Sequence, residues 1–402
     1  MQTTPGFPLR RGGGRVPAAS ANAVDVEIVT VRTTAERDLF VRFGEVIYRE
    51  DPLWIPPIFV ERKDFLDPKK NPFLRDGHAR VELFLARHGG EVVGRIAAID
   101  NPRYNGFHNT QVGFFGMFES VEDPKVAHAL FEAAAAWVKG QGHKAMLGPV
   151  NLSTNHECGL LVEGFEYQPS MMMPYNPRYY AGLYEGCGFK KAKDLLAWEL
   201  STAVPPPDRL LKAAARAANE EGVTLRPLSL DHFGRDLGAI KAIYSEMLER
   251  NWGWVPMSEE EFDFLAQRFR PLTLLRSELC FIAEVKGEPV AFSITLPDAN
   301  VGLKAAGGRL SSWGLPIGLA KLAWKTRAND RLRVLMVGIK PGFQKRGVDA
   351  ALFTETLRVA RQLGYSGGEL GWTLEDDEGM NRSIESLGAR RYKTYRIYER
   401  KL

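Results

Sequence analysis

A short basic turn near the C-terminal end of the chain has the residue types and spacing of an anion-binding site. Between a strand-like run and a helical run it reads Gln344-Lys345-Arg346-Gly347. Backbone N–H groups converge in such a turn, and the following helix adds partial positive charge at its N-terminus. Gly347 permits close backbone approach, and the two cations add full charges. The turn therefore predicts a pyrophosphate site; a plain basic turn is the alternative.

A second group of polar side chains lies in the first half of the chain, at 149–176. Here a dense polar cluster is followed by flexible apolar residues, including Met171–Met173. This mixture predicts a pocket with a polar end and an apolar wall. His156 with Glu157 is a candidate general base, and a hydrogen-bonded loop histidine is the alternative. The candidate substrate contacts in this cluster are Asn151, Thr154 and Asn155.

A third candidate is the carboxylate of Glu369, within the strand-like run GGELGWTLE. A carboxylate at the end of a strand can take a proton from a nucleophile, directly or through water. The alternative is a carboxylate on the strand surface.

The segment 303–327 combines cations with aromatic and aliphatic residues and contains no acidic residue. Basic residues interleaved with Trp and Leu, without a long apolar run, are typical of a segment that lies in a membrane interface. Trp313 and Trp324 are therefore candidate contacts for a lipid-like substrate. A surface loop that packs on the other half of the chain is the alternative. The cations are Lys304, Arg309, Lys321, Lys325 and Arg327.

The sequence that contains these groups consists of two similar halves. Trp54 and Trp254 each precede an aliphatic residue and a proline, 200 residues apart. FLARHGGEVVG from Phe84 matches FIAEVKGEPVA from Phe281, and both read as β-hairpins. The repeat predicts two copies of one unit, separated by the stiff linker STAVPPPD. The second copy has an insertion near 299–330.

Each copy predicts a strand, one or two helices, a hairpin, then alternating strands and helices. In the second copy we expect strands at 223–228, 333–339, 368–374 and 392–399, a hairpin at 280–296, and helices at 235–249, 259–270, 349–363 and 380–387. The predicted class is α/β, with two tandem domains, each a twisted mixed sheet flanked by helices. The expected boundaries are a disordered tail at 1–24, a first domain at 25–204, a linker and connecting helix at 205–222, and a second domain at 223–402.

The run VGIKPGFQKRGVDAAL resembles the acyl-CoA signature of the GNAT N-acyltransferase superfamily, which is Gln/Arg-x-x-Gly-x-Gly/Ala after a strand. The order of elements over 220–402 is also similar to that fold. The resemblance implies two strands, ending at Ile339 and Leu374, that splay apart around the pantetheine arm. The residues that it assigns to acyl-CoA are Val337, Gly338, Ile339, Gln344, Lys345, Arg346, Gly347, Val348, Asp349 and Asn381.

The chain departs from this pattern in both copies. Asp349 stands where Gly or Ala is usual; it either caps the helix or weakens phosphate binding. Ile384 stands where many members carry a tyrosine acid. Opposite the basic turn, the first copy has Glu122 and Asp123, which repel phosphate, and Pro124, which lacks an N–H. The first copy is therefore interpreted as a degenerate GNAT-like domain on the acceptor side, without CoA.

Long stretches such as GPVNLSTNHECGLLVEGF and WTLEDDEGMNRSIESLGARRYKTYRIYE are similar to a group of tandem GNAT-like bacterial proteins that includes the bacterial ceramide synthases. The resemblance implies an acyl-CoA-dependent N-acyltransferase with acyl-CoA as co-substrate, a primary amine as acceptor and a long-chain sphingoid base as the amine. Two alternatives are a small-molecule or peptide N-acetyltransferase using acetyl-CoA and a non-catalytic, CoA-binding, membrane-associated protein.

Bulk composition limits the remaining partners. The net charge of +4 does not require that the protein binds nucleic acid. The three cysteines, Cys158, Cys187 and Cys280, lack metal-ligand spacing, so we expect free thiols in a reducing compartment and no metal. No run approaches the apolar length of a membrane span. We expect a cytoplasmic protein whose further partner is the inner-membrane surface.

Overall fold

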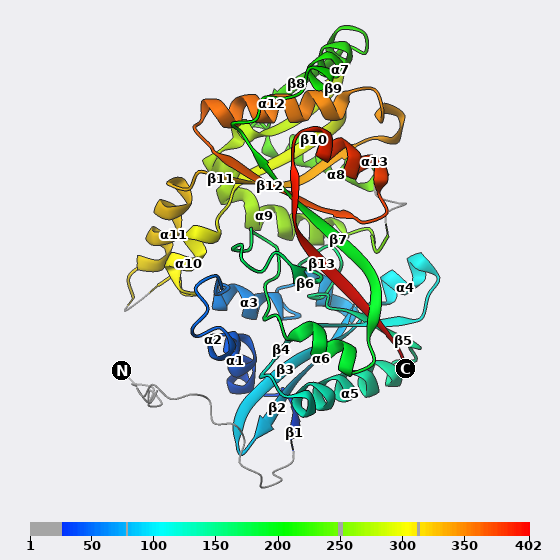
Figure 1. The fold of residues 1–402 in the computed structure, drawn as a ribbon, viewed down its shortest axis with the longest axis vertical. Coiled ribbons are helices and arrows are strands. Elements are labelled where there is room, and N and C mark those ends of the chain that lie inside the picture. Colours follow the sequence, from blue (N-terminus) through cyan, green and yellow to red (C-terminus); the bar gives the residue numbers. More distant parts are fainter. Residues whose placement is uncertain (1–25, 78, 248–251, 312–313) are drawn as a thin grey trace.

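The strands of the two copies form one continuous sheet. The computed structural model describes residues 26–77, 79–247, 252–311 and 314–402, so the tail predicted at 1–24 lies outside the described residues. Within them a 13-stranded sheet runs the length of the molecule, with helices on both faces (Figure 1). The mixed α/β class predicted from the sequence is confirmed.

The first copy contains seven strands and six α-helices in its described residues. Its strands are β1 (Glu27–Thr30), β2 (Arg80–His88), β3 (Glu91–Asp100), β4 (Val112–Ser120), β5 (Ala145–Gly148), β6 (Leu160–Glu163) and β7 (Lys190–Ser201). Its helices are α1 (Thr34–Arg42), α2 (Gly44–Ile47), α3 (Phe59–Phe65), α4 (Pro102–His108), α5 (Pro124–Gly140) and α6 (Tyr180–Gly186). The start of α1 is fixed by a capping box, in which Thr33 and Glu36 satisfy each other's backbone N–H groups.

The second copy repeats this order after a connecting helix, α7 (Asp208–Asn219). Its strands are β8 (Val223–Pro227), β9 (Cys280–Val285), β10 (Glu288–Pro297), β11 (Arg331–Ile339), β12 (Gly367–Leu374) and β13 (Arg390–Lys401). Its helices are α8 (Phe233–Met247), α9 (Glu259–Leu275), α10 (Asn300–Ala306), α11 (Ile317–Arg327), α12 (Val348–Gln362) and α13 (Glu378–Ser386). The helices α10 and α11 form the insertion predicted near 299–330.

The last strand of each copy lies in the sheet of the other copy. Strand β7 of the first copy pairs with β12, where Glu199 lies opposite Glu369. Strand β13 of the second copy pairs with β5, where Glu399 lies opposite Leu147. The two exchanged strands also pair with each other and form the long antiparallel ribbon in the middle of Figure 1. This exchange joins the two half-sheets through backbone hydrogen bonds.

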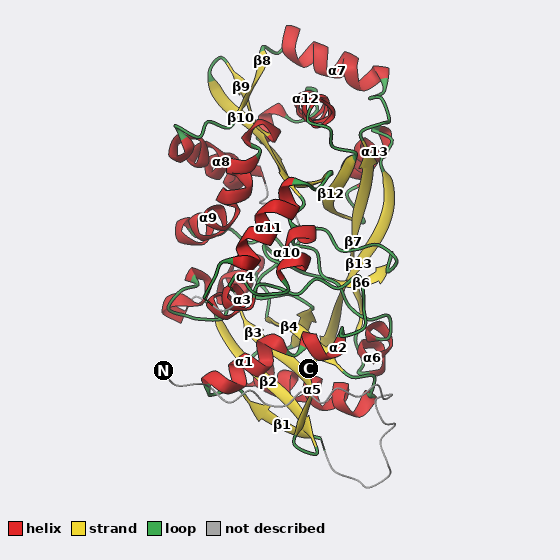
Figure 2. Ribbon diagram, turned by 90° about the vertical axis from the view of Figure 1, so that its left-hand side faces the viewer, coloured by secondary structure: helices red, strands yellow, loops and turns green. Residues whose placement is uncertain are grey.

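Helices cover the sheet in two sets. The long helices α5 and α12 lie on one face, and each is packed against the strands of its own copy. The helices α1, α3, α8 and α9 lie on the opposite face, on the left of Figure 2. The insertion helices α10 and α11 lie between the two copies on that second face. The space between the copies is therefore walled by α3, α9, α10 and α11.

Candidate active site

The basic turn of the second copy leads directly into the N-terminus of α12. Gly347 is the N-cap of this helix, with φ +79°, and no side chain caps it. Lys345 also has a left-handed backbone, with φ +61°, and its side chain is exposed. The helix N-terminus therefore keeps the donor groups that an anion needs. Asp349 lies in the first turn of α12 and is not its N-cap.

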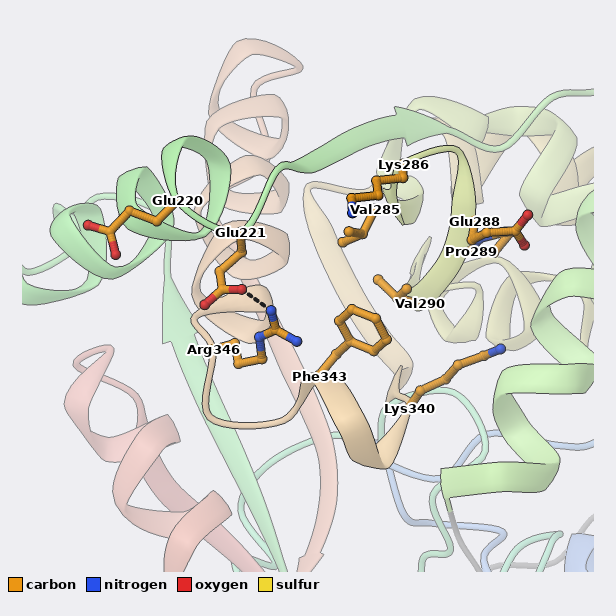
Figure 3. A pocket seen from close by; sticks show the side chains of 10 residues that line it. All are labelled: Glu220, Glu221, Val285, Lys286, Glu288, Pro289, Val290, Lys340, Phe343 and Arg346. Atoms are coloured by element: carbon orange, nitrogen blue, oxygen red, sulfur yellow. Dashed lines mark hydrogen bonds and ion pairs between the residues drawn. The ribbon is translucent and has the colours of Figure 1, made fainter.

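The two cations of the turn are used differently. Arg346 forms an ion pair with Glu221, at the end of the connecting segment after α7. Figure 3 shows this pair at the edge of a pocket of about 660 Å³ that also contains Phe343, Lys340 and the β9–β10 turn. Because Glu221 already balances Arg346, the exposed Lys345 is the cation available to a phosphate at the helix terminus.

The neighbour of Gly347 in the structure is α7. A Cβ atom at this position would lie 2.6 Å from the carbonyl oxygen of Ala213 and 3.4 Å from the Cβ of Ala217. The glycine is therefore required both by its left-handed backbone and by the close packing of the connecting helix. The sequence interpretation had assigned this glycine only to the approach of a ligand.

The strands β11 and β12 pair over a short stretch and then separate. Their parallel register runs from Arg331 opposite Gly367 to Val334 opposite Leu370. Beyond that point β11 stays paired with β10 as far as Ile339, and the described chain has no β11–β12 register pair. The edge of Val337, Gly338 and Ile339 that faces β12 thus lies in an opening between two strands.

The corresponding opening in the first copy is filled by the chain itself. Val150 donates its backbone N–H to Phe115 at 2.7 Å, and Asn151 Oδ1 accepts the backbone N–H of Met117 at 2.8 Å. Gly116 is forced by this packing, because a Cβ there would lie 2.0 Å from the carbonyl oxygen of Val150. Asn151 therefore occupies the backbone N–H of Met117, which could otherwise bind a ligand in this copy. The described residues of the second copy show no equivalent contact.

A cavity of about 640 Å³ lies between the two copies. Its first-copy wall comes from α1, α3, β4 and the loops around 149–160 and 169–176, and its second-copy wall comes from α9, α10 and α11. The second-copy side is largely apolar, with Leu265, Phe269, Leu272, Leu303 and Leu322. The predicted pocket with a polar end and an apolar wall thus has a counterpart in the structure.

The polar wall of this cavity contains three of the predicted residues, His156, Glu157 and Asn151. Glu157 accepts from Arg62 at 3.0 Å and from Asn151 at 3.0 Å. Burial raises the pKa of Glu157, but Arg62 and Asn151 outweigh that effect and hold it below its usual value. Glu157 is consequently an ionised counter-ion of Arg62.

His156 lies edge-on against Phe65 and Phe73, with ring centroids 5.0 Å and 5.8 Å away. Burial, aided by the charge of Arg268, lowers the pKa of His156 to about 4. Its Nδ1 atom is buried and has no hydrogen-bond partner among the described residues. The imidazole is therefore neutral near pH 7 and has one buried nitrogen without a hydrogen-bond partner in the described part of the chain.

Glu369 has a different environment from the one that its predicted role as a base requires. It is 1% exposed, forms an ion pair with Arg333, accepts from the hydroxyl of Tyr392 and lies 3.6 Å from the ammonium of Lys393. These partners make it the centre of a buried charge cluster. Arg333 also contacts Met173, which lines the cavity, at 3.1 Å. The cavity thus ends one side chain away from the point where β11 and β12 separate.

The remaining predicted residues have structural partners or lie outside the description. Thr154 and Asn155 hydrogen-bond the backbone of Gly253 and Val255, and so join the copies. Asn381 is buried on α13, and its amide donates to the carbonyl of Leu374 at 2.9 Å. Trp324 is 66% exposed on α11. Trp313 lies outside the described residues.

Two residues of the polar wall were missed by the sequence interpretation. Glu119 on β4 and Arg95 on β3 both line the cavity and lie 3.4 Å apart. The signal in the sequence was one charged residue within each of two otherwise apolar runs, GFFGMFES and VVGRIAAI. A charge in a buried strand must have a partner, and the partner or its ligand marks a site.

The structure resembles solved structures of the GNAT fold. It superposes on a tandem GNAT protein from the clavulanic acid biosynthesis pathway with a TM-score of 0.55 and 12% identity, covering 94% of this chain and 98% of that one. A second match, with a TM-score of 0.52 and 13% identity, is a GCN5-related glucosamine N-acetyltransferase region of a fungal multidomain enzyme; it covers 96% of this chain and 40% of that one. Together with the separating strands, these matches define the fold as a tandem GNAT fold.

Sequence comparison identifies the family. The chain is 35% identical over 394 residues to the bacterial ceramide synthase of Caulobacter vibrioides, covering 96% of this chain and all of the relative. It is 34% identical over 370 residues to protein YghO of Escherichia coli, covering 90% of this chain and 92% of the relative. The chain therefore belongs to the family of the bacterial ceramide synthase. No protein-family model matches it.

Proposed function

We propose that this protein transfers an acyl group from acyl-CoA to the amine of a long-chain sphingoid base. The observation that carries the proposal is the difference between the copies. Among the described residues no register pair joins β11 to β12 along Val337–Ile339, whereas Val150 and Asn151 fill the equivalent opening of the first copy. The second copy then binds acyl-CoA, and the first copy contributes the acceptor side of the cavity. The name of the Caulobacter relative supports a lipid amine as acceptor.

The residues of the second copy fit the thioester substrate. The amides of the turn before α12 and the side chain of Lys345 hold the pyrophosphate. The free backbone edge at Val337–Ile339 binds the pantetheine arm, and one of its N–H groups stabilises the oxyanion that develops on the thioester carbonyl. One such donor typically contributes about 3 kcal/mol.

The acyl transfer itself requires one proton acceptor. The amine nitrogen forms a bond to the thioester carbonyl carbon, its proton leaves, and the carbon–sulfur bond breaks to release CoA as the thiolate. We assign the proton acceptor to His156, because its buried Nδ1 has no partner among the described residues. The enclosure of Glu369 by Arg333, Tyr392 and Lys393 favours a structural role for that carboxylate.

The insertion helices support a lipid acceptor taken from a membrane surface. Leu315, Leu319 and Trp324 are 58%, 50% and 66% exposed on or near α11. The same segment carries five cations, of which Lys325 lies 4.7 Å from the centroid of the Trp324 ring. The described residues include no helix long and apolar enough to cross a bilayer. Leu319 is also part of the cavity wall, so the cavity opens where the apolar surface is exposed. Contact with an anionic membrane would then place the cavity mouth at the lipid surface.

Release of free thiol from long-chain acyl-CoA tests the proposal directly. We expect purified full-length protein to release CoA when a sphingoid base is added. Replacing exposed Lys345 by Glu should raise KM for acyl-CoA roughly 10-fold, because two units of charge change beside a phosphate. Lys69→Glu, an equally exposed lysine in the first copy, is the matched control and should leave KM unchanged.

The same assay separates the alternatives. Efficient turnover of acetyl-CoA with small amines, and none with sphingoid bases, would replace the lipid proposal by a small-molecule acetyltransferase. Binding of acyl-CoA in calorimetry without any thiol release would identify a CoA-binding protein without catalysis. Equal KM values for Lys345→Glu and the parent would remove the phosphate site from the turn.

A further inference from the structure

The polar end of the cavity contains a buried network that centres on Glu119. Tyr48 and Tyr180 donate their hydroxyls to Glu119 Oε2 at 2.8 Å and 2.7 Å. The Tyr180 hydroxyl in turn accepts the backbone N–H of Ser120 at 2.9 Å. Trp54 stacks on Tyr48 with ring centroids 5.1 Å apart, which fixes the tyrosine. The carboxylate is therefore held in one orientation by groups that have their own partners.

One oxygen of Glu119 remains available to a ligand. The Oε1 atom receives only a long contact from Arg95, at 3.4 Å, whereas Oε2 accepts both tyrosine hydroxyls. A carboxylate oxygen can accept two hydrogen bonds, so Oε1 has capacity that the described network does not use. Both Glu119 and Arg95 line the cavity.

Arg95 also has an unused group at the same end of the cavity. Its terminal nitrogens are bound to the carbonyls of Phe40 and Val41 and to Glu119. Its Nε atom is buried and has no hydrogen-bond partner among the described residues. A buried donor without a partner is costly, by about 1–3 kcal/mol. An oxygen from a ligand would remove this cost.

We propose that Glu119 and Arg95 form a recognition site for a 2-amino alcohol headgroup. The amino N–H donates to Glu119 Oε1, and the neighbouring hydroxyl oxygen accepts from Arg95 Nε. The inference rests on the proposed function and names the residues that recognise the headgroup of its acceptor. It concerns residues that line the cavity of the first copy, away from the acyl-CoA turn.

The charge balance favours a neutral hydroxyl over a carboxylate or phosphate beside Arg95. The guanidinium is already balanced by Glu119, so an anionic ligand group would leave the buried site with an uncompensated negative charge. A hydroxyl fills the same acceptor position without that charge. The apolar walls from α9, α10 and α11 then accommodate the hydrocarbon chain of the amino alcohol.

Three amines of equal chain length test this site with wild-type enzyme. They are a long-chain 2-amino-1,3-diol, a long-chain 2-amino alcohol and the 2-aminoalkane without hydroxyls. We expect KM for the 2-aminoalkane to be about 10-fold higher or more, because Arg95 Nε is then left without a partner. We expect kcat to change less than KM, since the hydroxyl that Arg95 binds is not a reacting group.

A pair of variants separates recognition from folding. Glu119→Gln keeps an oxygen for Tyr48 and Tyr180 but weakens the bond to the amine, so it should raise KM for all three amines. Glu261→Gln makes the same change at a buried carboxylate that is paired with Arg103 and does not line the cavity, and it should leave KM for the three amines unchanged. Tryptophan fluorescence and urea midpoints report whether each variant is folded.

The outcomes distinguish this inference from the proposed function. Absence of thiol release with every amine would refute the proposed function. Turnover of all three amines with equal KM, or a Glu119→Gln variant with wild-type KM for the three amines, would refute the recognition site while leaving the transferase intact. Calorimetric binding of the amino alcohol to the wild type, weakened by Glu119→Gln without acyl-CoA present, would support the site independently of turnover.

Discussion

Replacing Gly347 by alanine should loosen the connecting helix from the start of α12. The new Cβ would lie 2.6 Å from the carbonyl oxygen of Ala213, closer than the 3.0 Å below which real Cβ contacts are essentially never found, so α7 must move. Overpacking of this kind costs about 1–3 kcal/mol. The left-handed backbone, with φ +79°, adds about 1–2 kcal/mol for a residue with a side chain. The expected total is about 2–5 kcal/mol.

Gly364→Ala provides a matched control for this prediction. Gly364 follows the other end of α12, has φ +81°, and its added Cβ would meet nothing within 4 Å. It should therefore cost only the backbone strain, about 1–2 kcal/mol. Hydrogen exchange of the amides of α7 and the first turn of α12 measures the local effect, and urea midpoints measure the global one. Equal protection and equal midpoints in the two variants would show that α7 does not press on Gly347 as described.

Three other properties follow from the buried groups. Glu369→Gln should lower the free energy of unfolding by about 3–5 kcal/mol, because it leaves the buried cations Arg333 and Lys393 without their counter-ion. A loss of activity with an unchanged urea midpoint would instead indicate a catalytic carboxylate. The pKa of His156 is about 4 in the folded protein and 6.5 in the unfolded chain, so the unfolded chain binds the proton first as the pH falls. The free energy of unfolding should therefore decrease between pH 6.5 and pH 4. Urea titrations at several pH values should show that His156→Asn removes this part of the pH dependence. Burial raises the pKa of the Cys158 and Cys280 thiols to about 12. A thiol reagent at neutral pH should therefore modify the half-buried Cys187 first. Peptide mass spectrometry after brief labelling would show the order of modification.

The local elements could be predicted closely from the sequence, because their periodicity depends on neighbouring residues. The strand expected at 333–339 is β11, Arg331–Ile339, and the helix expected at 349–363 is α12, Val348–Gln362. The helix expected at 259–270 continues to Leu275, past Pro271, because its apolar face extends along the cavity. The domain boundaries stay a prediction.

The exchange of the last strands could not be predicted from the same pattern. The strands β7 and β13 have similar lengths and similar burial patterns, so the sequence of each is compatible with pairing to β5 or to β12. Which strand pairs with which edge depends on how the two copies pack together, and the sequence repeat contains no information on that packing. A repeat therefore predicts the unit but not which copy supplies each strand.

The site was predicted best where a motif is contiguous in the chain. The turn at 344–347 and the polar loop at 151–157 each appear as one short run, and Asn151, His156 and Glu157 all line the cavity. The burial of Glu369 could not be predicted, because its partners, Arg333 and Lys393, come from other strands, 36 and 24 residues away, and its role as a base stays a prediction. Contacts of that kind depend on strand register and are not visible in a local pattern.

The position of β13 has a consequence for how the protein is made. Strand β13, Arg390–Lys401, completes the edge of β5 in the first copy although the two strands lie far apart in the chain. During synthesis the first half of the protein emerges long before β13, so the β5 edge stays unpaired until residues 390–401 have been made. A ribosome-bound nascent chain must therefore keep an open sheet edge until that point, and loss of β13 would leave both halves of the enzyme incomplete.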